Sequence, residues 1–302
     1  MKKIIVFSAF SFGIAWLFWS PLFFLQKAAA PYATAIMSAG MFAPLIAALL
    51  TKLVLHDRSG LMLKPHIKGN VRHYLFALFF PAVAAAAGAA VYFSVFPGQF
   101  DAGLPAFKSA LLSASPAAAS LEGGAVTGLF IAQLAFAVLL APFINAIFAF
   151  GEETGWRGYL LPALLEKLPR RGALIVCGVI WGLWHTPLII LGHNYGTGCA
   201  GYPLSGILAM CLFCICAGIV LCYLTAKTKS IWPAALAHGA INAVAGVGMY
   251  FLADASAADP LLGPAMTGAL SLLPLAGAAV YCFIRFPSVL NNNENKSQEV
   301  FE

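Results

Sequence analysis

Eight long apolar runs, separated by short polar connections, dominate the pattern of residues along the chain. The runs cover residues 4–25, 31–53, 74–96, 126–150, 173–191, 204–225, 231–253 and 264–284. Each run is close to the ~20 apolar residues that a helix needs to cross ~30 Å of hydrocarbon. The pattern therefore predicts an all-α, polytopic membrane protein with about eight transmembrane helices.

The composition supports this prediction and limits the partners. Hydrophobic residues make up 61% of the 302 residues and charged residues only 9%, against about 25% charged in an ordinary soluble domain. The net charge of +6 is compatible with nucleic-acid binding, but the basic residues do not form one patch. We therefore expect the lipid bilayer, and no nucleic acid, among the partners. Most of the seven cysteines lie in apolar runs, which is typical of small buried fillers and not of a disulfide framework.

The connections alternate between basic and nearly uncharged. Lysine and arginine residues precede the first run and follow the second, fourth, sixth and eighth runs. Because such residues are retained on the cytoplasmic side, both termini are predicted to be cytoplasmic in a multi-pass protein of the cell membrane. The first run is too long for a signal peptide, so a retained first helix is expected. Residues 1–290 are expected to form a single integral membrane domain, and residues 291–302 a disordered polar tail.

A few ionisable or amide side chains interrupt the apolar runs. Such groups are costly inside a bilayer, so each one is a functional hypothesis by default. His193, by contrast, is expected in an outer connection away from them. The interrupting residues are Glu152, Glu153 and Arg157 at the cytoplasmic end of the fourth run, His185 in the fifth, and His238 and Asn242 in the seventh.

The spacing of these residues predicts which of them share a helix face. Glu153 and Arg157 are four residues apart and can pair, whereas Glu152 is rotated by about 100° and is left for another role. His238 and Asn242 are also four apart. An interfacial salt bridge that ends a helix, and histidines that only form packing hydrogen bonds, remain the structural alternatives. In the fifth run, His185 directly precedes Thr186-Pro187, which predicts a kink there.

Two kinds of chemistry suit this set of side chains. A buried carboxylate beside an imidazole can hold and deprotonate a water molecule, while a second imidazole and a carboxamide donate hydrogen bonds to an oxyanion. Alternatively, two histidines and a carboxylate can ligate zinc and leave one position for water. The His-Glu-x-x-His motif and the Gly-x-Ser-x-Gly motif are absent, and the aspartates all fall in connections. Standard zincin, serine and aspartyl mechanisms are therefore not expected.

Three motifs carry a family resemblance: Glu152-Glu153-x-x-x-Arg157, Trp181-x-x-x-His185 and His238-x-x-x-Asn242. In this order, on three predicted helices, they resemble the CPBP intramembrane proteases, also called Abi proteins or type II CAAX prenyl endopeptidases. The resemblance covers residues 141–247 and implies a catalytic core at about 125–250. It also implies an eight-helix fold with a cavity open to the cytoplasm and the bilayer. The aromatic residue of the second motif is often Phe in the family and is Trp181 here, where it is expected to line the substrate cavity.

The resemblance implies a CAAX-type intramembrane endopeptidase that hydrolyses a peptide bond in a membrane-embedded or lipidated peptide. The family has been described both as metal-dependent and as metal-free glutamate proteases. Two alternatives for the cofactor therefore remain. The protein uses none, or it uses a divalent metal such as zinc, with Glu152, His185 and His238 as candidate ligands. By the resemblance, Glu152 and His185 activate the water, His238 and Asn242 stabilise the oxyanion, and Glu153 with Arg157 orients the site.

Two other functions compete with this one. The first is a non-catalytic, peptide-binding membrane protein of the same fold, of the bacteriocin immunity type. The second is a proton-coupled transporter that uses Glu152 and the histidines as a relay. The intact set of candidate residues favours the enzyme over the first alternative, and their clustering on one side of the membrane favours it over the second. The compact, basic-loop architecture indicates a bacterial protein, in which a prenylated substrate does not follow automatically.

Overall fold

The computed structural model describes residues 1–121 and 123–286, so the expected tail at 291–302 lies outside the described residues. Within the described part the chain is helical, and its strand-like pairing is limited to one isolated bridge between Phe100 and Leu252. The prediction of an all-α membrane protein is confirmed.

The first half of the chain, up to the end of α7 at Leu139, forms long helices joined by short helical pieces. Lys2–Phe24 (α1) leads through short pieces into a broken second pass, and Val71–Val95 (α5) follows a long connection. Several of the helices begin with proline in their first turn, where the missing N–H has no intrahelical partner to lose. The other elements are α2 (Gln26–Ala29), η1 (Ala30–Tyr32), α3 (Ala33–Gly40), α4 (Ala43–Val54), η2 (Pro97–Gln99), α6 (Pro105–Ala114), η3 (Pro116–Ser120) and α7 (Gly123–Leu139).

The second half contains the segments on which the candidate residues lie. Helix α7 and helix α8 (Ala141–Gly155) meet at a bend of 43°. Helix α8 continues into one π-helical turn, η4 (Trp156–Leu160). The remaining elements are α9 (Leu161–Leu165), α10 (Arg170–Trp184), α11 (Thr186–Ile190), α12 (Leu204–Thr228), α13 (Trp232–Val244), η5 (Val247–Phe251), η6 (Ala255–Ala257) and α14 (Leu273–Ile284).

The fifth apolar run is broken where the sequence predicts a kink. Helix α10 ends at Trp184, and α11 begins with Thr186 and Pro187. Proline has no N–H to donate to the carbonyl four residues earlier, at Leu183. The hydroxyl of Thr186 donates to that carbonyl instead, at 2.6 Å. His185 therefore lies at the junction between two helices.

The number of spans differs from the prediction. In the described residues, five helices are long and apolar enough to cross a membrane, and six if the bent pair of α7 with the following helix counts as one span. The expected fifth span is divided into α10 and α11, because of Pro187. The expected eighth span retains only the 12 residues of α14, which starts at Leu273, has Pro274 in its first turn and follows a folded-back segment. By length, the described residues thus contain five or six full spans where about eight were expected, although each of the eight apolar runs contains helix.

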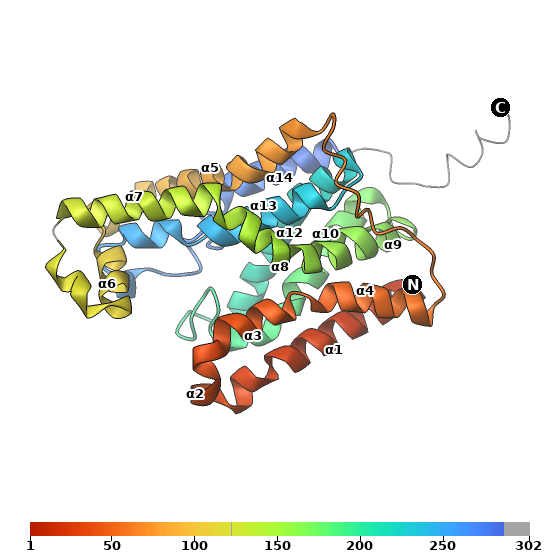
Figure 1. Cartoon of the computed structure of the whole chain (residues 1–302), viewed down its shortest axis with the longest axis horizontal. Coiled ribbons are helices and arrows are strands. Elements are labelled where there is room, and N and C mark those ends of the chain that lie inside the picture. The colour runs from red at the N-terminus through yellow and green to blue at the C-terminus, as the bar shows by residue number, and fades with distance from the viewer. Residues whose placement is uncertain (122, 287–302) are drawn as a thin grey trace.

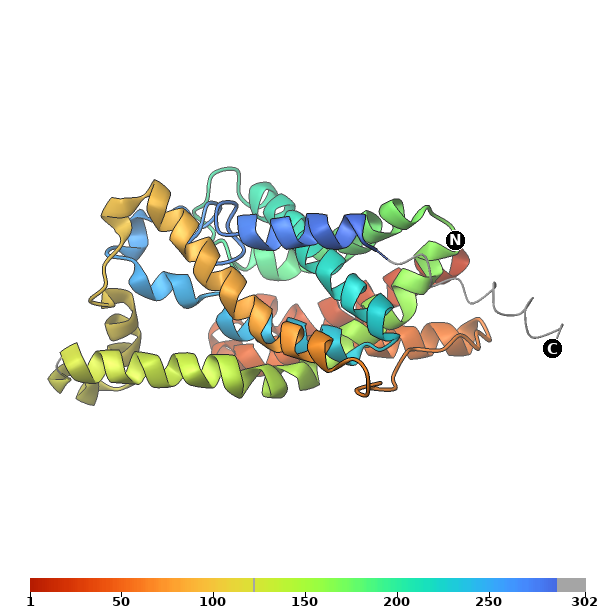
Figure 2. The same ribbon diagram turned by 90° about the horizontal axis from the view of Figure 1, so that it is seen from above.

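Helices α8, α10, α12 and α13 form the centre of the molecule. Helix α13 packs against α8 and α5, α10 packs against α12, and α1 packs against α4. Figure 1 shows α1 to α4 on one side and α5, α7 and α14 on the other, with α8, α10 and α12 between them. Seen from above, α5 crosses obliquely between α7 and α14 (Figure 2).

The connections rich in basic residues gather at one end of the molecule. Lys3 lies 3.2 Å from Asp57 and 3.3 Å from Glu166, which joins the start of α1 to two later connections. The Nδ1 atom of His66 lies 3.1 Å from the carbonyl oxygen of Thr228, which brings the end of α12 to the same place. The N terminus and the end of α14 lie at this end too (Figure 1).

Candidate active site

The end of α8 carries its two glutamates into the protein interior. Helix α8 approaches α4 closely, because a Cβ atom at Gly155 would lie 2.4 Å from Cβ of Pro44. A larger residue at this position would push the two helices apart. The side chains of Glu152 and Glu153 are both buried, with exposed fractions of 2% and 0%. Burial of two adjacent carboxylates requires a separate partner for each.

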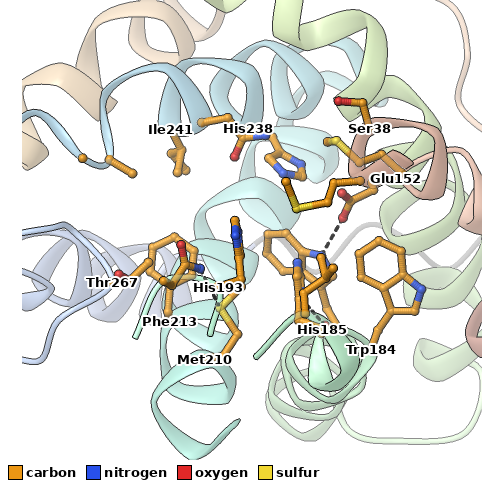
Figure 3. Close-up of a pocket in the computed structure, with 18 of the residues that line it drawn as sticks. Ser38, Glu152, Trp184, His185, His193, Met210, Phe213, His238, Ile241 and Thr267 are labelled. Atoms are coloured by element: carbon orange, nitrogen blue, oxygen red, sulfur yellow. Dashed lines mark hydrogen bonds between the residues drawn. The ribbon is translucent and has the colours of Figure 1, made fainter. Parts of the chain in front are cut away.

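Glu152 is held by two tryptophans. Its Oε2 atom accepts a hydrogen bond from Nε1 of Trp181 on α10, at 2.7 Å, and another from Nε1 of Trp156 in η4, at 3.2 Å. Figure 3 shows the bond between Glu152 and α10 at the wall of a cavity. The Oε1 atom accepts no hydrogen bond from the described residues. One oxygen of this carboxylate is therefore fixed, and the other is available to a ligand in the cavity.

Glu153 belongs to a separate buried network. Its Oε1 atom lies 2.9 Å from Nη1 of Arg157 and 2.8 Å from Nδ1 of His238 on α13. The guanidinium of Arg157 also lies over the ring of Trp181, 4.3 Å from its centroid. The four-residue spacing of Glu153 and Arg157 is thus realised as a fully buried ion pair. This pair anchors His238 from the side that faces away from the cavity.

In both histidines the Nδ1 atom has a hydrogen-bond partner among the described residues and the Nε2 atom does not. The Nδ1 atom of His185 lies 2.8 Å from the carbonyl oxygen of Trp181. Because a carbonyl can only accept, Nδ1 of His185 carries the proton and Nε2 is the free nitrogen. The same reasoning applies to His238, whose Nδ1 faces the carboxylate of Glu153. Both rings can therefore act through Nε2.

One cavity of about 360 Å³ brings most of the candidates together. Its wall includes five of the predicted site residues, from α8, α10, the junction after α10, and α13. Figure 3 shows three of them, Glu152, His185 and His238, around the cavity. Glu153 and Arg157 do not line it, since they lie in the network behind His238. The five predicted residues in the wall are Glu152, Trp181, His185, His238 and Asn242.

The cavity also contains residues that the sequence analysis missed. His193 lines it (Figure 3), although an outer position away from the site was expected, because the connection after α11 folds back over the cavity. Trp184 and Trp19 form another part of the wall. Trp156 donates to Glu152 without any motif that would mark it, apart from its place in the stretch between Glu153 and Arg157. No spacing rule predicts these contacts, since they depend on how distant segments pack.

The described residues do not fit a zinc ion. Among residues 1–121 and 123–286, no group of three His, Cys, Asp or Glu side chains is arranged to hold a metal. The hydrogen bonds of Glu152, His185 and His238 leave Oε1 and the two Nε2 atoms without protein partners in this part of the chain, but these side chains are not grouped as three metal ligands. The sequence-based alternative of a zinc site built from these three residues thus finds no matching geometry.

Comparisons with known proteins agree with the motifs. Residues 127–244 match the family model described as type II CAAX prenyl endopeptidase Rce1-like. The chain is also 33% identical, over 101 residues, to the CAAX prenyl protease 2 of Methanococcus maripaludis. That alignment covers 33% of this chain and 37% of the relative. The matches confirm the resemblance to the CPBP family, in the segment that contains the cavity residues of α8, α10 and α13.

Proposed function

We propose that the protein is an intramembrane endopeptidase that hydrolyses a peptide bond in a membrane-embedded or lipidated peptide. The observation that carries the proposal is the cavity wall, where a carboxylate with one free oxygen faces two imidazoles and a carboxamide. The family match and the name of the archaeal relative support the same reaction class. Both termini are proposed to be cytoplasmic, since the basic connections gather at one end.

The first step assigns the water to Glu152 and His185. The Oε1 atom of Glu152 takes a proton from water, while Nε2 of His185 accepts the second hydrogen of that water as a hydrogen bond. The water oxygen then attacks the carbonyl carbon of the peptide bond. A positioned general base of this kind contributes about 10²- to 10⁴-fold to the rate.

The second step assigns the oxyanion to α13. Glu153 accepts the Nδ1 proton of His238, so that a further proton on Nε2 makes this ring a cationic donor. The carboxamide of Asn242, one helical turn further along, supplies a neutral donor. When the tetrahedral intermediate collapses, the carboxyl group of Glu152 returns its proton to the leaving amine. The products are one carboxylic acid and one amine, which balances the added water.

The test compares the wild-type protein with Glu152→Gln in detergent, on matched lipidated and unlipidated peptides. The amide keeps the size of the side chain but cannot take a proton, so cleavage is expected to fall by at least about 10²-fold. The metal content of both samples is measured at the same time. Cleavage by Glu152→Gln at the wild-type rate would contradict the assignment. Binding of peptides without cleavage by the wild type would favour the peptide-binding alternative.

A further inference from the structure

The carboxylate of Glu152 is held on one side only, and both of its donors are indoles. The two N–H groups come from different elements, η4 and α10, and converge on the same oxygen atom, Oε2. Trp156 is 0% exposed and Trp181 is 2% exposed. Because both rings are buried, neither can turn away without displacing its neighbours. For Trp156 these neighbours include the rings of Phe7 and Trp184.

Trp181 contacts four other residues of the site. Besides donating to Glu152, its ring lies under Arg157 and 5.2 Å, centroid to centroid, from His238 in an edge-on arrangement. Its carbonyl oxygen accepts the Nδ1 proton of His185. The backbone and side chain of one residue thus set the positions of the proposed base, the proposed water-holding histidine and the ion pair behind them.

We infer that Trp181, assisted by Trp156, is a positioning residue that fixes Oε2 of Glu152 and so directs Oε1 at the water; this inference rests on the proposed function. A carboxylate with two free oxygens samples several orientations, and each unproductive orientation lowers the rate. Hydrogen bonds to the charged form also favour that form over the neutral acid. The two indoles therefore aim Glu152 and favour its charged form, in a site where burial opposes that charge.

The surroundings of Glu152 contain several other groups that can change charge. Glu153 and Arg157 follow it in the same helical segment, His238 faces it from α13, and His185 from the junction between α10 and α11. The connection after α11 contributes His193, and α12 contributes Cys214, whose Sγ lies 4.0 Å from Nδ1 of His185. The wall residues from α1 and α3 carry no charge. Several of these groups can therefore contribute to the pH dependence of the rate. The test needs a variant that removes only one hydrogen-bond donor to Glu152.

Trp181→Phe supplies this comparison, because it keeps an aromatic ring and removes the N–H. We expect kcat about tenfold lower, as for the loss of one hydrogen bond to a charged group, with KM close to the wild-type value. The acidic limb of the pH–rate profile should move up by about one pH unit. Trp156→Phe should act in the same direction but less, since its bond is longer, at 3.2 Å against 2.7 Å.

The matched control is Trp232→Phe. The Nε1 atom of Trp232 also donates at 2.7 Å, but to the carbonyl oxygen of Leu63, and this ring does not line the cavity. Loss of this N–H should leave the acidic limb of the pH–rate profile unchanged. Unfolding midpoints in detergent separate misfolding from loss of positioning. If Trp181→Phe does not fold, Trp156→Phe carries the test. A folded Trp181→Phe with unchanged kcat and an unchanged limb would overturn the inference.

A second readout does not need turnover. Infrared spectra recorded against pH follow the carboxyl C=O band that disappears in Glu152→Gln. In Trp181→Phe this band should appear at a pH higher by about one unit. If the wild type cleaves no peptide, the proposed function fails, and this titration still decides the positioning of Glu152. Identical titrations of wild type and Trp181→Phe would overturn the inference whatever the peptides show.

Discussion

Helices α12 and α1 have similar lengths and are both apolar enough to cross a membrane, but their surroundings are very different. In the most apolar 18-residue window of each, 67% of the residues of α12 are buried, against 22% for α1. Helix α12 packs against α10, α13 and α14, whereas α1 packs mainly against α4 and α3. The hydropathy of a segment thus indicates that it belongs in a membrane, but not whether its neighbours are helices or lipid.

The polar groups follow the same division. The central region, formed by α8, η4, α10, α12 and α13, contains a fully buried ion pair and the cavity. At the periphery, charged pairs lie at the ends of helices, as between Lys3 and Asp57. A charge in the central region depends on protein partners, while a peripheral charge has water available. Variants that affect the two regions equally would contradict this division.

The largest effect is expected from Arg157→Met. The substitution leaves Glu153 and its charge buried without the guanidinium, which typically costs about 3–5 kcal/mol. It also removes the cation over Trp181, so peptide cleavage should fall together with stability. The peripheral control is the exposed Arg170 at the start of α10, where Arg170→Met should change stability by less than about 0.5 kcal/mol. Thermal unfolding in detergent measures both.

A second substitution sharpens this prediction. In the Arg157→Met background, Glu153→Gln removes the unpaired charge, so part of the lost stability should return. Activity should not return, because His238 then lacks a charged partner for Nδ1. Equal stability of Arg157→Met and Arg170→Met would show that the buried pair contributes nothing to the central region.

A smaller effect is expected from adding one methyl group at a helix contact. A Cβ atom at Gly178 in α10 would lie 2.6 Å from Cα of Ile215 in α12. Gly178→Ala should therefore force these helices apart, at a cost of about 1–3 kcal/mol. At Gly13 in α1, no atom lies within 4 Å of an added Cβ, so Gly13→Ala should be neutral or stabilise by up to about 1 kcal/mol. Unfolding midpoints that fall equally for both variants would rule out close packing as the difference between α12 and α1.

The sequence predicts best where local rules apply. The apolar runs, the break at His185 and the pairing of Glu153 with Arg157 all follow from spacing or from proline chemistry. The shared cavity of Glu152 and His238 follows from the cost of polar groups in a bilayer. For the apolar runs, the break and the ion pair, the relevant interaction is visible within one helix or one turn.

The remaining features depend on contacts between distant segments. The indole of Trp181 reaches Glu152 across 29 residues. His193 enters the cavity because its connection folds back, although its lack of charged neighbours is typical of an outer loop. The shortness of α14 depends on the turns that precede it. Hydropathy cannot separate a full-length span from an apolar run that is partly folded back into the protein.

The smallest effect concerns the peripheral cluster at the start of α1. Burial acts to raise the pKa of Asp57, but hydrogen bonds from the Ser59 amide, Lys3 and Tyr159 outweigh it and lower this pKa below the ordinary value. Because the pKa is lower in the folded state, the stabilisation is present above about pH 4 and is lost as the pH falls through the folded value. Asp57→Asn should therefore lower stability by about 0.2–1 kcal/mol at pH 7, and by less at pH 3. Unfolding midpoints at the two pH values measure the difference. A gap between wild type and variant that is as large at pH 3 as at pH 7 would mean that Asp57 acts through its shape and not its charge, and the contrast between the two regions would then rest on the buried pair alone.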